Sequence, residues 1–218
     1  MEVFLPVFLV VFMMGCLFLG IIRALPWENK RVKIITITGP SGVGKTTIVG
    51  ELIKRHPEWG MVLSRTSRAP RENKDLPGEY QCNVSKKRFL RWRKEGRDLW
   101  MVSEHGNMYA TLKDDVDGAF AAKVVLFMQL LPASVPKILD YVSDRVKPIF
   151  IVPPDEEEIR RRLTKRGESP EQIERSIADC KNWEEEARES GIPYKFVRND
   201  RTVAEAVEKV ERIIDQNI

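Results

Sequence analysis

Short apolar runs that alternate with amphipathic segments dominate the hydrophobic pattern of the chain. Three runs rich in β-branched or aromatic residues predict strands buried in a parallel sheet, at residues 32–38, 124–131 and 148–152. In the last segment, an apolar residue recurs at helical spacing at Val203, Ala206, Val207, Val210, Ile213 and Ile214. Strands that alternate with helices predict an α/β fold with a parallel sheet flanked by helices.

Three further helices are predicted between and after these strands. The first covers residues 47–56 and has one apolar face. Asp155 followed three residues later by Glu158 resembles a capping box, which predicts a helix over residues 156–166. A charged helical pattern follows at residues 170–187.

The N-terminal segment is apolar without any such alternation. Residues 3–22 are 20 consecutive residues without a charge, and a helix of that length spans about 30 Å, enough to cross a bilayer. Because basic residues dominate just after it, the positive-inside rule places the remainder in the cytoplasm. We expect a single-pass membrane anchor at residues 1–23 and a linker at 24–31. The alternatives are a cleaved signal peptide, or a translation start further along that would leave the protein cytoplasmic.

Composition narrows the class of protein. The chain has 218 residues, of which 43% are hydrophobic and 31% charged. These values indicate one core-forming domain at residues 32–218 and exclude a large multidomain protein or a disordered one. A net charge of +4 does not choose between small anions, nucleic acid and an anionic membrane. The three cysteines share no metal-ligand spacing and favour a reducing compartment.

A phosphate-binding signature follows the first predicted strand. It matches G-x-x-x-x-G-K-[ST], and with the next position it consists of Gly39, Pro40, Ser41, Gly42, Val43, Gly44, Lys45, Thr46 and Thr47. Glycines let backbone N–H groups turn toward phosphate oxygens, Lys45 supplies a mobile cation, and Thr46 offers its hydroxyl to Mg²⁺. A plain glycine-rich turn gives no reason for lysine and threonine in this order. We therefore expect ATP and Mg²⁺ to bind at this loop.

A second cluster of basic and hydroxyl residues suits a bound phosphate. Its members are Ser64, Arg68, Arg71, Tyr80, Tyr109 and Thr111. The segments S-R-T-S-R-A-P-R, G-E-Y and G-N-M-Y-A-T follow the phosphate-binding loop in an order that resembles the guanylate kinase family. This resemblance covers the chain from about residue 32 to the C-terminus, and it implies that the cluster grips the phosphate of an acceptor nucleotide. A solvated basic loop, or one that touches RNA, is the alternative.

The resemblance also implies a P-loop NTPase-type fold with two mobile parts. These are a small acceptor-binding subdomain at about residues 64–112 and a helical lid at about residues 160–190. It assigns Arg162, Arg166 and Arg175 to the lid, where they would close over the transferring phosphoryl group. It further places Asn199 beside the adenine of ATP. The candidate catalytic residues are thus Lys45, Arg71, Arg162, Arg166 and Arg175.

Three positions depart from the family pattern. Trp100 stands where the family has a carboxylate that reads the guanine edge, and an indole cannot accept those protons. Either Glu104 substitutes through a shifted loop, or Trp100 fills a gap in the core. Gln129 and Leu131 stand where the family places two aspartates. Mg²⁺ would then rely on Thr46, the nucleotide phosphates and solvent.

Together these features predict an ATP-dependent phosphotransferase that acts on a phosphorylated small-molecule acceptor, with GMP first by resemblance. Trp100 and Gln129 leave a sugar phosphate kinase, similar to the ribose 1,5-bisphosphate kinases, as one alternative. A non-catalytic, membrane-tethered binding module is another, although such modules characteristically lack a working P-loop. We expect no nucleic acid partner, and the sequence leaves the oligomeric state open.

Overall fold

The computed structural model describes residues 33–71, 75–104, 106–120, 124–142 and 145–215. The predicted anchor and linker at residues 1–31 lie outside this part of the chain. Within the described ranges, no helix is both long and apolar enough to cross a bilayer. The described residues belong to one compact unit.

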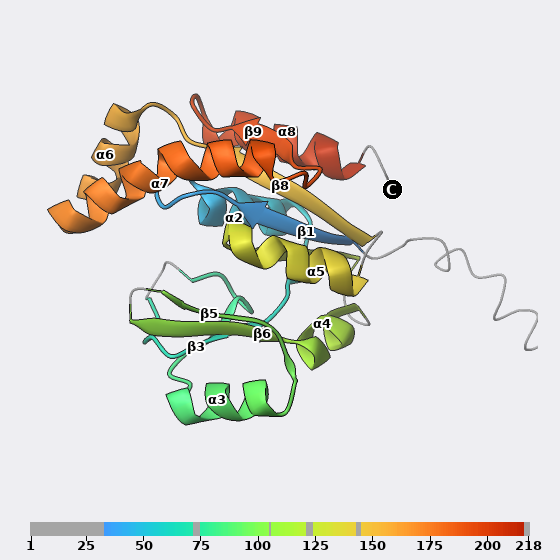
Figure 1. Cartoon of the computed structure of the whole chain (residues 1–218). Coiled ribbons are helices and arrows are strands. Elements are labelled where there is room, and N and C mark those ends of the chain that lie inside the picture. The colour runs from blue at the N-terminus through green and yellow to red at the C-terminus, as the bar shows by residue number, and fades with distance from the viewer. Residues whose placement is uncertain (1–32, 72–74, 105, 121–123, 143–144, 216–218) are drawn as a thin grey trace, which may run out of the picture. The chain divides into compact units, whose positions relative to one another are not determined.

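The main sheet has five strands, all parallel to their neighbours, in the order β2-β7-β1-β8-β9 (Figure 1). The strands are β2 (Gly60–Met61), β7 (Val125–Gln129), β1 (Lys33–Thr38), β8 (Val146–Val152) and β9 (Lys195–Arg198). The three apolar runs are confirmed as the central strands β7, β1 and β8. Each central strand lies between two neighbouring strands and two layers of side chains, which is why its sequence is apolar at consecutive positions.

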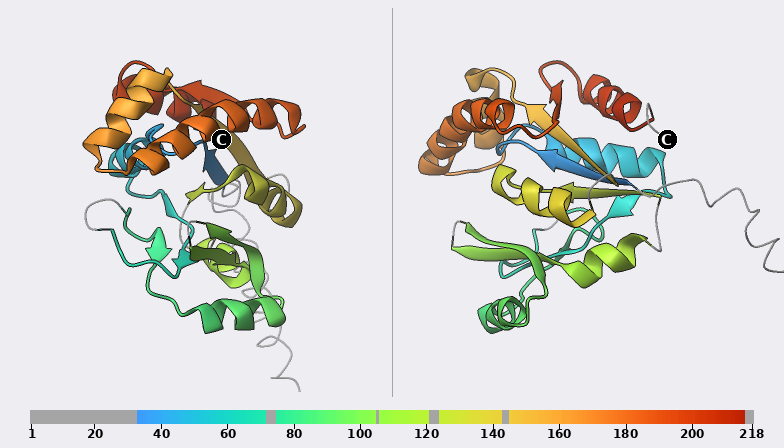
Figure 2. Two further views of the ribbon diagram at one scale, coloured as in Figure 1. Left: turned by 60° about the vertical axis from the view of Figure 1, so that its left-hand side comes forward. Right: turned by 45° about the vertical axis from the view of Figure 1, so that its right-hand side comes forward.

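Helices cover both faces of the main sheet (Figure 2). The helices of the domain are α2 (Lys45–Arg55), α3 (Lys86–Lys94), α4 (Lys113–Phe120), the 3₁₀ turn η1 (Pro132–Ser134), α5 (Val135–Val142), α6 (Glu156–Lys165), α7 (Pro170–Glu189) and α8 (Val203–Asp215). Because side chains alternate along a strand, Ile35 of β1 enters the core formed with α2 and α8, whereas Ile34 enters the core formed with α5. The predicted C-terminal helix is confirmed as α8.

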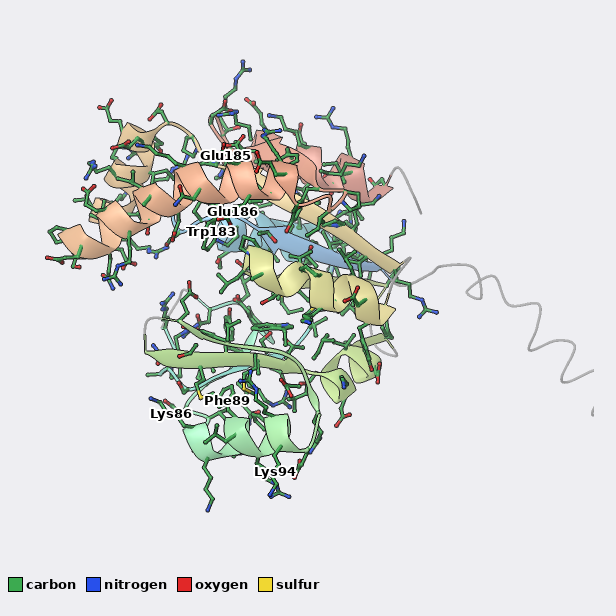
Figure 3. All side chains as sticks on the ribbon, in the orientation of Figure 1. Lys86, Phe89, Lys94, Trp183, Glu185 and Glu186 are labelled. Atoms are coloured by element: carbon green, nitrogen blue, oxygen red, sulfur yellow. The ribbon has the colours of Figure 1, made fainter. Side chains whose placement is uncertain are left out.

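The predicted insert at residues 64–112 forms a second sheet with the strand order β4-β3-β6-β5. Its strands are β4 (Tyr80–Gln81), β3 (Ser64–Thr66), β6 (Asn107–Leu112) and β5 (Asp98–Glu104). Helix α3 packs Phe89 against Ala110 and Leu112 on one face of this sheet, and Figure 3 shows Phe89 between α3 and the strands. Tyr109 therefore faces the other way, toward the core that contains α5.

Two helices, α6 and α7, occupy the residues of the predicted lid. Helix α6 begins where the sequence indicates, because the Asp155 carboxylate accepts a hydrogen bond from the Glu158 N–H at 2.8 Å. The expected capping box is only half formed, since the Glu158 carboxylate binds Arg161 and Arg162 instead.

Helix α7 contributes to both cores of the main sheet. Near its start, Ile173 and Ile177 pack in the same core as α2 and α8. Near its end, Trp183 and Ala187 pack in the core that contains α5, and Figure 3 shows Trp183 on the side of α7 that faces the main sheet. Helix α7 is therefore packed against the main sheet through both of its halves.

Candidate active site

The phosphate-binding motif forms a tight loop between β1 and α2. Gly39 and Gly44 adopt φ values of 145° and 96°, which residues with a side chain rarely adopt. A Cβ atom on Gly39 would lie 2.6 Å from the carbonyl oxygen of Ile151, and one on Gly44 would lie 2.5 Å from Nδ2 of Asn199. Helix α2 begins at Lys45 without a side-chain cap from Gly44, so the N–H groups of its first turn are available to an anion. This cradle fits the phosphates of ATP.

Asn199 braces the loop from the segment just after β9. Its Nδ2 donates a hydrogen bond of 2.8 Å to the Val43 carbonyl oxygen, and the residue is only 2% exposed. The resemblance placed Asn199 in the ATP site beside the adenine. The structure places its side chain against the phosphate-binding loop, where it fixes the position of a backbone carbonyl.

Lys45 folds back onto the loop that precedes it. Its Nζ donates to the carbonyl oxygens of Gly39 at 2.6 Å and Pro40 at 2.9 Å. Burial lowers the pKa of Lys45 to about 8, and the positive charge of Arg166 contributes a smaller effect in the same direction. A phosphate that displaces the two carbonyl oxygens would supply a full negative charge and raise this pKa again.

Thr46, the predicted Mg²⁺ ligand, lies in the first turn of α2, and Thr47 beside it is exposed. The Thr46 hydroxyl donates to Oε1 of Gln129 at 3.2 Å, and Nε2 of Gln129 donates to Oε1 of Glu79 at 2.9 Å. Since a hydroxyl that donates in this direction keeps its lone pairs for a cation, Thr46 fits the Mg²⁺ of MgATP. Glu79 is buried, and burial raises its pKa. Sequence reasoning missed Glu79, whose only signal was its place beside Tyr80.

Arg162 of the lid reaches the phosphate-binding loop. Its guanidinium donates long hydrogen bonds to the carbonyl oxygens of Gly42 at 3.5 Å and Asn199 at 3.4 Å. Nε of Arg162 also binds the Glu158 carboxylate at 2.7 Å. Hydrogen bonds from Arg161, which has the larger effect, and from Arg162 lower the pKa of Glu158 to about 2. The lid arginine is thus held in place by a carboxylate that stays ionised.

Arg166 is the second lid arginine at the loop. Its Nη2 donates to the Ser41 hydroxyl at 3.1 Å and to the Glu168 carboxylate at 2.6 Å. Arg175, the third, lies in the first half of α7 with an exposed side chain. The structure therefore brings two of the three predicted lid arginines to the phosphate-binding loop.

The acceptor cluster gathers on neighbouring strands of the second sheet. Ser64 of β3 and Thr111 of β6 share a hydrogen bond of 2.8 Å between their hydroxyl oxygens. Tyr80 pairs with Ser64 along β3 and β4, and its ring lies 6.2 Å from that of Tyr109. Residues far apart in the sequence are thus brought together, but Ser64 and Thr111 are buried and their hydroxyl groups bond each other.

Arg68 lies over the ring of Tyr80 and already binds a carboxylate of this protein. Its guanidinium is 4.8 Å from the centre of the Tyr80 ring, and its two Nη atoms bind the Asp75 carboxylate at 2.8 and 2.6 Å. The Arg71 N–H donates to the same carboxylate at 3.0 Å, while the Arg71 side chain is exposed. Burial opposes the effect, but these hydrogen bonds lower the pKa of Asp75. Asp75 therefore presents to Arg68 the paired oxygens that a phosphate would present.

Trp100 is a core residue, and its side chain is not exposed to contact a substrate base. It is 7% exposed and packs in one cluster with Val62 and Leu126. Glu104, the possible substitute, lies at the end of β5, and its charge acts on Lys45 to raise that pKa. Leu131 is half-buried and begins the turn before α5. The structure thus supports the packing interpretation of Trp100.

A separate cavity of about 490 Å³ lies between α7 and the segment that joins β8 to α6. Pro153, Pro154, Ile159, Ile177 and Cys180 form part of its wall, and none of the predicted site residues lines it. The rest of its wall is charged, and the four glutamates Glu156, Glu184, Glu185 and Glu189 outnumber Lys181 and Arg188. This excess of negative charge disfavours a phosphate, so the phosphate chemistry belongs to the loop and not to this cavity.

The loop and the acceptor cluster are neighbours, because two hydrogen bonds join Thr46 through Gln129 to Glu79, the residue before Tyr80. The loop forms a cradle of backbone N–H groups at the start of α2, and the acceptor cluster places the guanidinium of Arg68 over the ring of Tyr80. This arrangement defines a P-loop phosphotransferase whose acceptor is itself a phosphate group.

Known proteins support the same conclusion. A family model described as guanylate kinase matches residues 31–217. A guanylate kinase from Synechocystis is 30% identical over 187 residues, which cover 84% of this chain and 94% of the relative. One from Rubrobacter xylanophilus is 30% identical over 188 residues, or 85% of this chain and 96% of the relative. The crystal structure of guanylate kinase from Anaplasma phagocytophilum shares the fold, with a TM-score of 0.62 at 19% identity over 86% of this chain and 87% of that one.

The chain belongs to the guanylate kinase family, which confirms the resemblance noted from its motifs. It is accordingly a phosphotransferase that uses a phosphate group as acceptor.

Replacement of Gly44 by alanine tests the tight loop. We expect Gly44→Ala to weaken ATP binding at least about tenfold, because the new Cβ collides with Nδ2 of Asn199 and opens the cradle. Gly96→Ala is the matched control, since Gly96 also has a positive φ but its Cβ would meet nothing within 4 Å. Isothermal titration with ATP and a melting curve for each variant measure the effect. Equal ATP affinity in the two variants would contradict the prediction.

The lowered pKa of Lys45 predicts a pH dependence of ATP binding. Below pH 8 the Lys45 amine is already protonated in the free protein. Above pH 8, Lys45 must take up a proton when ATP binds, so the dissociation constant for ATP rises about tenfold per pH unit. Titrations between pH 7 and 9.5 measure this slope. In Lys45→Met, binding is weaker but the slope is lost, and a wild-type profile as flat as that of the variant would refute the assignment.

Proposed function

We propose that this protein transfers the terminal phosphoryl group of ATP to the phosphate of a nucleoside monophosphate, with GMP as the first acceptor. The observation that carries the proposal is the pair of hydrogen bonds that connects the P-loop threonine Thr46 through Gln129 to Glu79, the residue before strand β4 of the second sheet. The relatives named guanylate kinase support GMP as the acceptor.

On the donor side, the chain supplies position and positive charge. The backbone N–H groups of the loop and Lys45 hold the phosphates. Arg162 and Arg166 approach the same loop from the lid and neutralise charge on the transferring group. When bound, MgATP would supply the phosphoryl group and a divalent cation, which the Thr46 hydroxyl would help to hold.

On the acceptor side, Arg68 and Arg71 bind the acceptor phosphate, and Ser64, Tyr80 and Tyr109 add hydroxyl donors. Arg68 must first exchange the Asp75 carboxylate for the phosphate. The Arg68 guanidinium is therefore oriented before the acceptor binds. The acceptor phosphate has to compete with the Asp75 carboxylate for it.

Recognition of the base differs from that expected in the family. With Trp100 packed in the core, two charge-assisted hydrogen bonds to guanine are absent, which lowers discrimination by about a hundredfold or more. We therefore propose a GMP kinase of reduced base selectivity. The relatives give no support to a sugar phosphate kinase or to a non-catalytic module, and the latter also disagrees with the intact Lys45 and Thr46.

A membrane location with the kinase domain in the cytoplasm rests on the sequence of residues 3–22 alone. The relatives do not support it, and the family match begins at residue 31. Washing membranes that contain the full chain at alkaline pH tests it. A spanning anchor keeps the protein in the pellet, and release into the supernatant would exclude one.

Turnover with a panel of acceptors tests the proposed function. We expect the full chain to release ADP from MgATP with GMP, more slowly with dGMP, AMP or UMP, and not with ribose phosphates. Arg68→Ala should raise the acceptor KM about a hundredfold while the dissociation constant for ATP stays within about twofold, because only the acceptor phosphate loses its fork. Lys45→Ala should abolish turnover.

The control for Arg68→Ala is Arg91→Ala, since Arg91 is an exposed arginine of α3 in the same subdomain. It should leave both constants unchanged. No ADP release with any of these acceptors would refute the kinase proposal, and an unchanged acceptor KM in Arg68→Ala would remove Arg68 from the site.

A further inference from the structure

A hydrogen-bonded chain of three side chains has a defined direction. A carboxylate only accepts hydrogen bonds, and Oε1 of Glu79 accepts from Nε2 of Gln129 at 2.9 Å. The amide of Gln129 is thereby oriented, so its Oε1 faces Thr46 and accepts the hydroxyl proton at 3.2 Å. The lone pairs of the Thr46 oxygen must then point away from Gln129.

Glu79 is also held in place by contacts other than its hydrogen bond with Gln129. Leu76, Pro77, Gly78 and Glu79 form a tight turn, in which the Glu79 N–H donates to the Leu76 carbonyl oxygen at 3.0 Å and Gly78 has a φ of 77°. Proline followed by a glycine with positive φ is the pattern of a type II turn. The second carboxylate oxygen of Glu79 accepts from the Leu76 N–H at 3.0 Å. Both oxygens of Glu79 are thus satisfied, and the side chain is 5% exposed.

We propose that Glu79 is a positioning residue that acts through Gln129 to aim the Thr46 oxygen at the Mg²⁺ of MgATP. This inference rests on the proposed function, because it concerns the same donor site. Gln129 ends strand β7, and Glu79, from the segment just before β4, brings a carboxylate to it. An outer partner of this kind fixes the geometry of the group that touches the metal.

The position of Glu79 also links the two substrate sites. The next residue, Tyr80, lies under Arg68 of the acceptor cluster, and the Glu79 carbonyl oxygen accepts from the Ser64 N–H at 2.8 Å. A shift of this segment when the acceptor binds would therefore act on the Thr46 hydroxyl. By linkage, MgATP should change acceptor affinity by the same factor as the acceptor changes MgATP affinity.

Equilibrium binding of ATP, with Mg²⁺ or with a chelator, tests the proposal without turnover. We expect Glu79→Leu to weaken ATP binding about tenfold in Mg²⁺ and to leave binding in chelator within about twofold, because only the metal-dependent part relies on Thr46. Glu79→Gln keeps an acceptor oxygen for Gln129 and should restore most of the loss. Glu95→Leu is the matched control, as Glu95 is a glutamate at the end of α3 in the same subdomain.

Gln129→Leu breaks the chain at its centre and leaves the turn that holds Glu79 intact, so it serves if Glu79→Leu is unstable in a melting curve. It should show the same metal-dependent loss, and the double variant should lose no more than either single one. Equal losses with and without Mg²⁺, no loss in either variant, or additive losses would each overturn the positioning role. A wild-type protein that shows no Mg²⁺-dependent ATP binding would instead contradict the proposed function itself.

Discussion

The parallel pairing of β1 with β7 and β8 is the constraint on which the site depends. Ile37 of β1 pairs with Gln129 of β7 and with Ile149 of β8. Because parallel strands end at the same edge of a sheet, the segments that follow them meet there. The phosphate-binding loop follows β1, the lid follows β8, and Asn199 follows β9. Hydrogen bonds from Asn199 to the loop and from Thr46 of α2 to Gln129 then tie the loop and the first turn of α2 to that edge.

The arginines of the site share one electrostatic arrangement. Three of them are held by a carboxylate, in the pairs Arg68–Asp75, Arg162–Glu158 and Arg166–Glu168. Such pairs keep a flexible guanidinium oriented and limit the repulsion between nearby cations. Binding of a phosphate then becomes an exchange of one anion for another, which lowers affinity but leaves the geometry prepared.

The second sheet contributes both to the core and to the surroundings of the P-loop. Trp100 of β5 is buried in one cluster with Val62 and Leu126. Glu79, which directly precedes β4, carries its carboxylate to Gln129 next to Thr46. The insert is thus connected to the P-loop through side chains that lie outside the phosphate-binding motif.

The sequence by itself determined the central strands, the C-terminal helix, the P-loop and the phosphate-gripping motifs. Each of these depends on residues close together in the chain, such as an apolar run, a helical repeat or glycines that precede a lysine. Only the tertiary structure decided that Trp100 is a core residue, that Asp75 binds Arg68, and that Glu79 is connected to Thr46 through Gln129. Glu79 and Gln129 are 50 residues apart, and Gln129 and Thr46 are 83 apart. Contacts at such separations arise from the packing of two sheets, which no local pattern of side chains specifies.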